Sequence, residues 1–340
     1  MQPLIQQSNQ PTEQRSVVSF WNTLPKPFFV LAPMEDVTDA AFRRLIAKTG
    51  CPDVTWTEFT SADGLVRANE KGQTKLRRKL LYGKEERPIV AQLFSSNTAN
   101  MEAVSRLCLE LGFDGVDINM GCPDKSVEKQ MCGSGMIKHP DRAVEIIRAA
   151  KRGATSDIKS IPISVKTRIG YAHDEIDTWI PTLLQEDIGA LTIHMRTRNE
   201  MSDVPAHWDL MPRIVMLRDE IAPSTRIIGN GDVMTIGEGR QKCEELGCDG
   251  IMFGRAIFGN PWLFTNRDKD TISPQEKIAT LVKHITYFQE LLTGTVSEAV
   301  MKRHFKAYIS GWPGAAELRV RLMETQTLDQ AKEILIAFTE

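Results

Sequence analysis

The chain has 340 residues, of which 41% are hydrophobic and 25% are charged. A chain of this length buries about three quarters of the surface that it exposes when unfolded, which excludes a small scaffold held together by disulfides or metal ions. The average composition excludes long disorder, collagen-like repeats and coiled coils. Because 42 Lys and Arg oppose 44 Asp and Glu, for a formal charge of −2, no overall basic excess indicates a nucleic-acid partner.

Six cysteines are spread through the sequence, at Cys51, Cys108, Cys122, Cys132, Cys243 and Cys248. They are too sparse for a disulfide framework and lack the paired spacing of a zinc site. We therefore expect no bound metal and a reducing, cytoplasmic location. No N-terminal stretch joins basic residues to a long apolar run, and no segment reaches the roughly 18 apolar residues of a membrane span. We expect neither secretion nor membrane insertion.

Residues 1–24 are rich in Gln, Asn, Ser and Thr and lack a sustained hydrophobic period, which predicts a flexible N-terminal tail. Eight short runs with strand composition follow, at residues 28–33, 54–59, 89–94, 115–119, 161–167, 190–194, 226–229 and 250–253. Their starts are 24 to 46 residues apart. This spacing leaves room for a crossover helix after each strand rather than a hairpin.

Eight strand–helix units are the number found in a closed TIM (β/α)8 barrel, which we predict over residues 25–265. An open, doubly wound sheet remains the alternative, because strand number alone does not fix closure. The charged segment 266–270 then resembles a domain connector. Ser273, Pro274 and Glu276 supply the N-cap, first-turn proline and third-position glutamate that begin a helix. We therefore predict an α/β barrel followed by a small all-helical domain over residues 271–340.

Polar residues lie within or directly after seven of the predicted strands, toward the end where barrels carry their active sites. They are Glu35, Gln92, Asn119, Cys122, Lys166, Arg168, His194, Arg196, Asn230, Asp232 and Arg255. A single histidine or a single Asn-Gly turn would have a purely structural explanation. Amides, cations, an imidazole and a thiol at one rim instead indicate a ligand site. The many donors suit an electron-rich, anionic ligand.

Glycine-rich turns follow the last two predicted strands, at Gly229–Asp232 and at Gly254-Arg255. Barrels commonly bind phosphate at this place through backbone amides and helix N-termini. Arg255 would add a charge-assisted hydrogen bond. The alternative is that both turns serve only to reverse the chain.

Cys122 lies in a Gly-Cys-Pro sequence after the fourth predicted strand. Pro123 restricts Cys122 to extended geometry and donates no backbone hydrogen bond, so the thiol is expected on a rigid loop at the rim. An isolated cysteine is most often a small buried hydrophobe, and we interpret Cys51, Cys108, Cys243 and Cys248 in that way. The rim position of Cys122 instead favours a role as acid or nucleophile.

Two basic stretches interrupt the neutral average. Residues 67–87 contain eight Lys and Arg against three Glu, and residues 302–321 contain five against one, with His304, Phe305, Tyr308 and Trp312 interleaved. Such stretches can neutralise several phosphates, and aromatic rings among cations are surfaces on which RNA bases stack. The alternative is that both are ordinary solvated helix faces.

Several motifs together resemble those of the tRNA-dihydrouridine synthase family, and among bacterial members the B subgroup most. They are Ala32-Pro33-Met34 with Val37-Thr38-Asp39, the run Asp117 to Pro123, Val165 to Arg168, Thr192 to His194 with Arg196-Thr197-Arg198, Asn230-Gly231-Asp232, and Gly254-Arg255 with Pro261-Trp262. The resemblance extends from about residue 28 to the C-terminus. Its most specific part is Asn119 to Pro123 with its spacing to Lys166 and Arg168.

The resemblance implies an FMN-binding TIM barrel and a helical tRNA-binding domain, which together reduce the C5–C6 double bond of specific uridines in tRNA with NADPH. Cys122 would be the catalytic proton donor, and Asn119 and Arg168 would bind the uracil. The implied FMN-binding residues are Pro33, Met34, Glu35, Gln92, Lys166, His194, Asn230, Gly231, Asp232, Gly254 and Arg255. The implied tRNA-binding residues are Lys302, Arg303, His304, Tyr308 and Arg319. We expect a monomer.

Three positions depart from the family pattern. Residues 199–207 replace a loop that usually contains glycine, Cys132 and Met136 stand where small residues are usual, and Ala307 replaces a common aromatic residue. Two other functions remain open from the residues themselves. One is a flavin barrel enzyme acting on a free pyrimidine or small enone, and the other is a non-catalytic tRNA-binding module.

Overall fold

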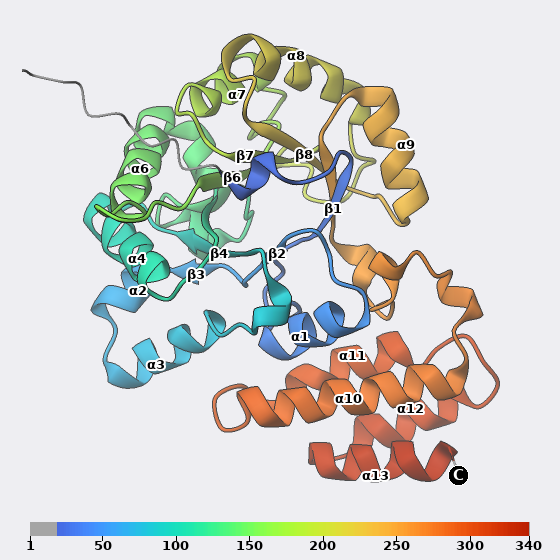
Figure 1. The fold of residues 1–340 in the computed structure, drawn as a ribbon. Coiled ribbons are helices and arrows are strands. Elements are labelled where there is room, and N and C mark those ends of the chain that lie inside the picture. The colour runs from blue at the N-terminus through green and yellow to red at the C-terminus, as the bar shows by residue number, and fades with distance from the viewer. Residues whose placement is uncertain (1–18, 340) are drawn as a thin grey trace, which may run out of the picture.

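The computed structural model describes residues 19–339, and its sheet is a barrel of parallel strands surrounded by helices (Figure 1). The strands are β1 (Phe28–Leu31), β2 (Thr55–Trp56), β3 (Thr60–Ser61), β4 (Ile89–Phe94), β5 (Gly115–Asn119), β6 (Ile163–Arg168), β7 (Ala190–His194), β8 (Arg226–Asn230) and β9 (Gly250–Phe253). Their order is β1-β9-β8-β7-β6-β5-β4-β2, with β3 also paired to β4. The prediction of a barrel is confirmed, and the alternative of an open, doubly wound sheet is wrong.

The barrel closes between β1 and β2, where the pairing is sparsest. Val30 and Val54 form a single parallel bridge, and the amide of Asp53 donates to the carbonyl of Phe29 at 2.9 Å. Of the predicted second strand, residues 54–59, only β2 forms, and β3 follows it as a further short strand. The two pair with opposite ends of β4. Between β2 and β3, the Glu58 carboxylate accepts the amide hydrogen of Asp36 at 2.7 Å. The pairing with β4 is interrupted at this point.

Helices follow the strands and form the outer layer. They are α1 (Ala40–Thr49), α2 (Ala62–Arg67), α3 (Glu70–Lys79), α4 (Thr98–Glu110), α5 (Lys125–Glu128), α6 (Pro140–Gly153), α7 (Ile176–Leu184), α8 (Met211–Ile221) and α9 (Ile236–Leu246). In α6 the residues Ala143, Ile146, Ile147 and Ala150 recur at helical spacing, and all are fully buried. This one-sided apolar face holds the helix on the barrel. By contrast, α3 has no buried residue.

The short 3-10 helix η1 (Phe20–Asn22) lies across the end of the barrel that faces the viewer in Figure 1. Its Trp21 is 1% exposed and packs against Phe28 and Trp56. The predicted flexible tail therefore ends earlier than residue 24, because this indole belongs to the apolar core. Residues 1–18 of that prediction lie outside the described residues.

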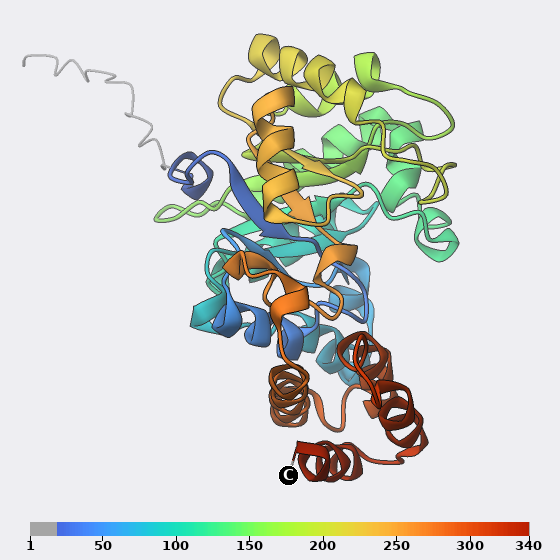
Figure 2. The same ribbon diagram turned by 90° about the vertical axis from the view of Figure 1, so that its right-hand side faces the viewer.

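The C-terminal helices form a separate layer beside α1 (Figures 1 and 2). They are α10 (Pro274–Leu292), α11 (Met301–Tyr308), α12 (Ala315–Glu324) and α13 (Leu328–Thr339). The predicted helix start is confirmed, since the Ser273 hydroxyl accepts the amide hydrogen of Glu276 at 3.1 Å with Pro274 in the first turn. Apolar residues of α10 and of α1 belong to one continuous core. We call α10–α13 the helical bundle.

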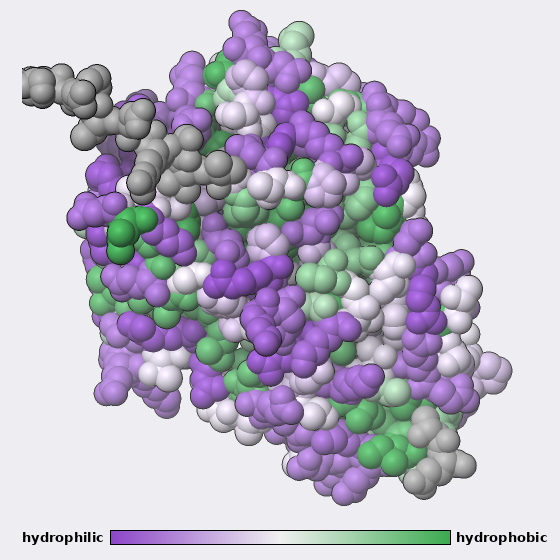
Figure 3. Space-filling view, viewed as in Figure 1, coloured by the Kyte–Doolittle hydropathy of each residue, from purple (hydrophilic) through white to green (hydrophobic). Residues whose placement is uncertain are grey.

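The face shown in Figure 3 is mostly hydrophilic, with apolar residues interspersed. Ile158, between α6 and β6, is 97% exposed. Within residues 19–339, no helix combines the length and the apolar character needed to cross a membrane.

Candidate active site

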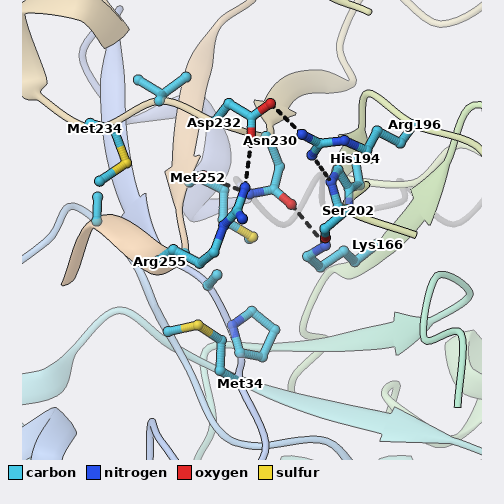
Figure 4. A pocket seen from close by; sticks show the side chains of 16 residues that line it. Met34, Lys166, His194, Arg196, Ser202, Asn230, Asp232, Met234, Met252 and Arg255 are labelled. Carbon is cyan, nitrogen blue, oxygen red and sulfur yellow. Dashed lines mark hydrogen bonds and ion pairs between the residues drawn. The ribbon is translucent and has the colours of Figure 1, made fainter. Parts of the chain in front are cut away.

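A cavity of about 250 Å³ opens at the carboxyl ends of the barrel strands (Figure 4). All the predicted cofactor residues except Glu35 and Gln92 line it, namely Pro33, Met34, Lys166, His194, Asn230, Gly231, Asp232, Gly254 and Arg255. The parallel register brings them together, because β1 and β6–β9 end at the same rim. The cavity also takes in Arg196, Ser202, Met234 and Met252, which the cofactor prediction omitted.

Asp232 joins two arginines across the cavity (Figure 4). One carboxylate oxygen pairs with the buried Arg196 and the other accepts from Arg255 at 2.5 Å, with 63% of the Arg255 side chain exposed. Hydrogen bonding to Arg196 holds the pKa of Asp232 below its usual value. Asp232 therefore orients both guanidinium groups while one of them stays open to a ligand.

His194 has a defined tautomer in this arrangement. A guanidinium can only donate hydrogen bonds, so the 2.9 Å contact between Arg196 Nη1 and His194 Nε2 requires Nε2 to accept. The proton of the neutral ring then lies on Nδ1. Burial, together with Lys166 and other cations, lowers the pKa of His194 well below its ordinary value. The imidazole is a neutral donor at physiological pH.

Lys166 projects from β6 toward β8 and donates from Nζ to Asn230 Oδ1 at 3.2 Å. Burial, with Arg168 as the next cause, lowers the pKa of Lys166 to about 8. The ammonium is therefore mostly charged at neutral pH. Lys166, Arg196 and Arg255 outnumber Asp232 in the cavity wall, so the site is positive and suits an anion.

The cavity also has an apolar side, formed by Met34, Met252 and the Cα of Gly254. A side chain at Gly254 would meet only the Met34 sulfur at 3.8 Å and Ala32 at 3.9 Å, so its Cβ would occupy space that glycine leaves open. A flat, partly apolar and anionic group such as FMN fits this donor set. At about 250 Å³ the cavity is just below the roughly 300–1,000 Å³ typical of small-molecule sites, so part of such a ligand must extend along the rim.

The Cys122 loop is rigidly held beside this cavity. Asn119 Oδ1 accepts the amide hydrogens of Gly121 and Cys122, at 3.1 and 2.9 Å. The amide and hydroxyl of Ser134 both donate to the Cys122 carbonyl at 2.9 Å. Gly133 has φ +57°, and a Cβ there would lie 2.6 Å from that carbonyl oxygen. Burial raises the pKa of the Cys122 thiol, which keeps it protonated.

Arg168 is buried and holds together the loops that follow β5 and β7. Its Nε donates to the Gly121 carbonyl at 2.8 Å, and its Nη1 donates to the carbonyls of Thr197 and Met201, both at 3.0 Å. Burial lowers the pKa of Arg168 to about 10, so it remains a cation. Within the described residues Nη2 has no partner, and it is the atom left for a ligand.

Two predicted cofactor residues do not line the cavity. Gln92 lies inside the barrel, where its amide nitrogen donates to Asp117 at 2.7 Å and its amide oxygen accepts from Asn119 at 3.0 Å. Glu35 turns away and pairs with Lys79 of α3. Gln92 is therefore placed to support Asn119, whereas Glu35 belongs to a neighbouring cleft.

The predicted tRNA-binding residues divide into two groups. Arg303 is 40% exposed at its side chain, and Lys302 and Arg319 are half-buried. His304 and Tyr308 are 0% exposed, so their side chains are unavailable to RNA, and this part of the prediction is corrected. They lie four residues apart on the buried face of α11, which packs on α10 and α1.

Comparisons with known proteins agree with this geometry. Residues 30–340 match the family model described as dihydrouridine synthase. The chain is 41% identical over 322 residues to a probable tRNA-dihydrouridine synthase of Staphylococcus epidermidis, covering 94% of this chain and 96% of the relative. It is 43% identical over 325 residues to probable tRNA-dihydrouridine synthase 2 of Bacillus subtilis, with the same coverage of each chain.

Two solved structures are similar in fold. One is 6-hydroxypseudooxynicotine amine oxidase from Pseudomonas geniculata, with TM-score 0.51 and 12% identity, covering 77% of this chain and 50% of that one. The other is a 2-naphthoyl-CoA reductase, with TM-score 0.51 and 10% identity, covering 70% and 49%. At such low identity these likenesses show the fold alone.

Proposed function

This chain belongs to the dihydrouridine synthase family, and we propose that it is an FMN-dependent oxidoreductase that reduces the C5–C6 double bond of specific uridines in tRNA with NADPH as reductant. The observation that carries the proposal is a positive, partly apolar cavity at the barrel rim beside a rigidly held, protonated cysteine. The names of the relatives and the extent of the family match support tRNA as the substrate. The barrel of residues 25–265 would carry the chemistry, and residues 271–340 would bind tRNA.

FMN would lie in the cavity lined by Lys166, Arg196 and Arg255, and when bound it supplies the hydride that reduces C6. Arg255 is the exposed cation suited to a phosphate group. Lys166 and His194 are donors suited to the electron-rich edge of a flavin ring. Met34 offers an apolar contact.

Reduction of the double bond also requires a proton at C5. Cys122 is the group suited to provide it, because its raised pKa keeps the thiol protonated at neutral pH. Donation leaves a thiolate, which regains its proton from solvent. Arg168 Nη2 is free to bind a uracil carbonyl oxygen. The side chain of Asn119, also expected at the uracil, is bonded to the Cys122 amide and to Gln92, so it would act by fixing the Cys122 loop. The target base must leave the RNA stack to reach these groups.

The experiment is an assay of purified holoenzyme with unmodified tRNA transcript and NADPH, followed by mass spectrometry of the digested nucleosides. Formation of dihydrouridine in tRNA and none from free uridine is expected. Reduction of free uridine at a comparable rate would support a small-pyrimidine enzyme instead. Tight tRNA binding by protein without flavin or product would indicate a binding module.

We also propose that the enzyme is a cytoplasmic monomer. All six cysteines are free thiols, as is usual for proteins of a reducing compartment. Light scattering after gel filtration should give the mass of one chain, and a dimer mass would contradict the proposal.

A further inference from the structure

Helix α3 carries an unusual concentration of unneutralised positive charge. It contains Lys71, Lys75, Arg77, Arg78 and Lys79 against one acidic residue, Glu70, and none of its residues is buried. Within residues 19–339 the side chains of Lys71, Lys75 and Arg77 make no hydrogen bond or ion pair. A helix that has no fully buried side chain and leaves three cations unpaired is suited to an anionic partner.

This helix forms one wall of a cleft of about 420 Å³ between the barrel and the helical bundle. Lys75, Arg78 and Lys79 line the cleft from α3, and Val296 and Ser297 line it from the segment before α11. Arg78 Nη1 donates to the Leu291 carbonyl of α10 at 2.6 Å. The contact fixes α3 beside α10, as Figure 1 shows.

The floor of the cleft is formed by acidic residues that are mostly paired with cations. Carboxylate oxygens of Glu35, Asp36 and Glu58 lie within 4.8 Å of one another. Lys79 is neutralised by Glu35, and Arg303 of α11 lies 3.5 Å from Asp36. Burial raises the pKa of Glu58 to about 7, so the floor carries little net charge. Phosphates are attracted mainly by the free cations of α3, and a polyanion would therefore be held along this helix.

We propose that α3 is a docking surface for the sugar–phosphate backbone of the tRNA substrate, on the wall of the cleft opposite the helical bundle. Lys71 and Lys75 are one turn apart, about 6 Å along the helix axis, and lie on the same face. They can contact neighbouring phosphates while α11 holds the RNA from the other side. The inference rests on the proposed function and assigns to α3 a part of the substrate contact that the barrel cavity does not provide.

The test uses holoenzyme and fluorescein-labelled, unmodified tRNA transcript, with binding measured by anisotropy between 50 and 200 mM salt. Replacing Lys71 and Lys75 by Ala should reduce the slope of log K against log salt by about 1.4 to 1.8, because each lost phosphate contact contributes about 0.7 to 0.9. Lys71→Arg with Lys75→Arg should retain the wild-type slope. NADPH-driven flavin reduction should be unchanged in both variants, which shows that the barrel is intact.

The matched control removes two exposed cations elsewhere, Arg106 late in α4 and Lys159 after α6, by replacement with Ala. Both lie toward the amino-terminal end of the barrel, and the control should keep the wild-type slope. An unchanged slope in the α3 variant, or an equal loss in the control, would overturn the docking surface. Either result would leave dihydrouridine formation by wild-type enzyme intact, whereas failure of that reaction would overturn the proposed function itself.

Discussion

Two sets of polar side chains, one in the cavity and one where α1 meets the helical bundle, differ in whether their hydrogen-bonding groups have partners. In the cavity, the guanidinium of Arg196 is bonded to His194 and Asp232. Where α1 meets the helical bundle, both ring nitrogens of His284 and of His304 lack a hydrogen-bond partner within the described residues. We call this second set the junction. An unpaired buried polar group costs about 1–3 kcal/mol, so the junction is built for packing and not for polar contact.

The packing at the junction is aromatic. The His284 ring stacks on Phe42 with centroids 5.1 Å apart, and the His304 ring stacks on Phe258 at 5.6 Å. Burial lowers the pKa of His304 to about 3, so the ring is neutral. In the cavity, hydrogen-bond and ion-pair partners orient Arg196, His194 and Asp232 for a ligand. At the junction, the uncharged histidine rings pack on aromatic side chains and stabilise the contact between barrel and bundle.

The largest effect is expected from the thiol beside the cavity. Cys122→Ala should lower the rate of dihydrouridine formation by about 10²- to 10⁴-fold, the usual contribution of a positioned general acid. Flavin content and flavin reduction by NADPH should be unchanged, because Cys122 does not line the cavity. Cys51→Ser changes an exposed cysteine between α1 and β2; it is the control and should keep full activity. If Cys122→Ala forms dihydrouridine at a rate within threefold of wild type, the thiol is not the proton donor.

The next effect concerns the exposed cation of the cavity. Arg255→Ala should weaken FMN binding by about ten- to a hundredfold, since a hydrogen bond to a charged group contributes about 1.5–3 kcal/mol. The dissociation constant can be measured by quenching of FMN fluorescence with apoprotein. Arg267→Ala removes another exposed, ion-paired arginine and should leave the constant unchanged. Equal constants for wild type and Arg255→Ala would place the phosphate elsewhere.

Much of the cavity could be predicted from the sequence because strand ends are local features. Once β6, β7 and β8 are identified, parallel pairing alone brings Lys166, His194 and Asn230 to one rim. The inward direction of Gln92 and the turn of Glu35 toward α3 depend on side-chain contacts with distant residues, which the sequence does not specify. The sequence places Arg196 just after a strand, but its ion pair with Asp232 depends on the contact between the loops that follow β7 and β8.

The assignment of His304 and Tyr308 to RNA failed for a different reason. Met301, His304, Phe305 and Tyr308 follow the i, i+3, i+4, i+7 spacing of a buried helix face, and all four are buried. That spacing could have indicated core packing from sequence alone. Composition alone groups these aromatic residues with the basic ones, although the buried and exposed side chains lie on different faces of the helix.

The junction predicts a specific pH dependence of stability. Its histidines are neutral when folded and have an ordinary pKa near 6.5 when unfolded, so the unfolded chain binds more protons below pH 6.5. Stability should therefore fall as pH decreases from about 6.5 toward 3, by at most about 1.4 kcal/mol per pH unit for each histidine. Urea unfolding between pH 7 and 4.5 measures this slope.

Replacing His304 by Phe removes one of the two titrating rings and keeps a flat side chain against Phe258. Its stability should decline less steeply with falling pH than that of wild type. His173→Asn, at an exposed position, should follow the wild-type slope. If His304→Phe and wild type lose stability in parallel, acid sensitivity does not come from the junction.

The smallest expected effect concerns Lys166. Burial lowers the pKa of this side chain, as it does for the junction histidines. The pKa of about 8 means that the ammonium loses its proton as pH rises through 8, and the neutral amine is a weaker donor to an anion. The gap between charged and neutral hydrogen bonds is about 1 kcal/mol, so FMN binding should weaken by about fivefold between pH 7 and 9.5. Lys166→Arg stays charged over this range and should bind FMN with a constant independent of pH. The same weakening in Lys166→Arg would show that another group titrates and that the charge of Lys166 does not set the pH dependence of FMN binding.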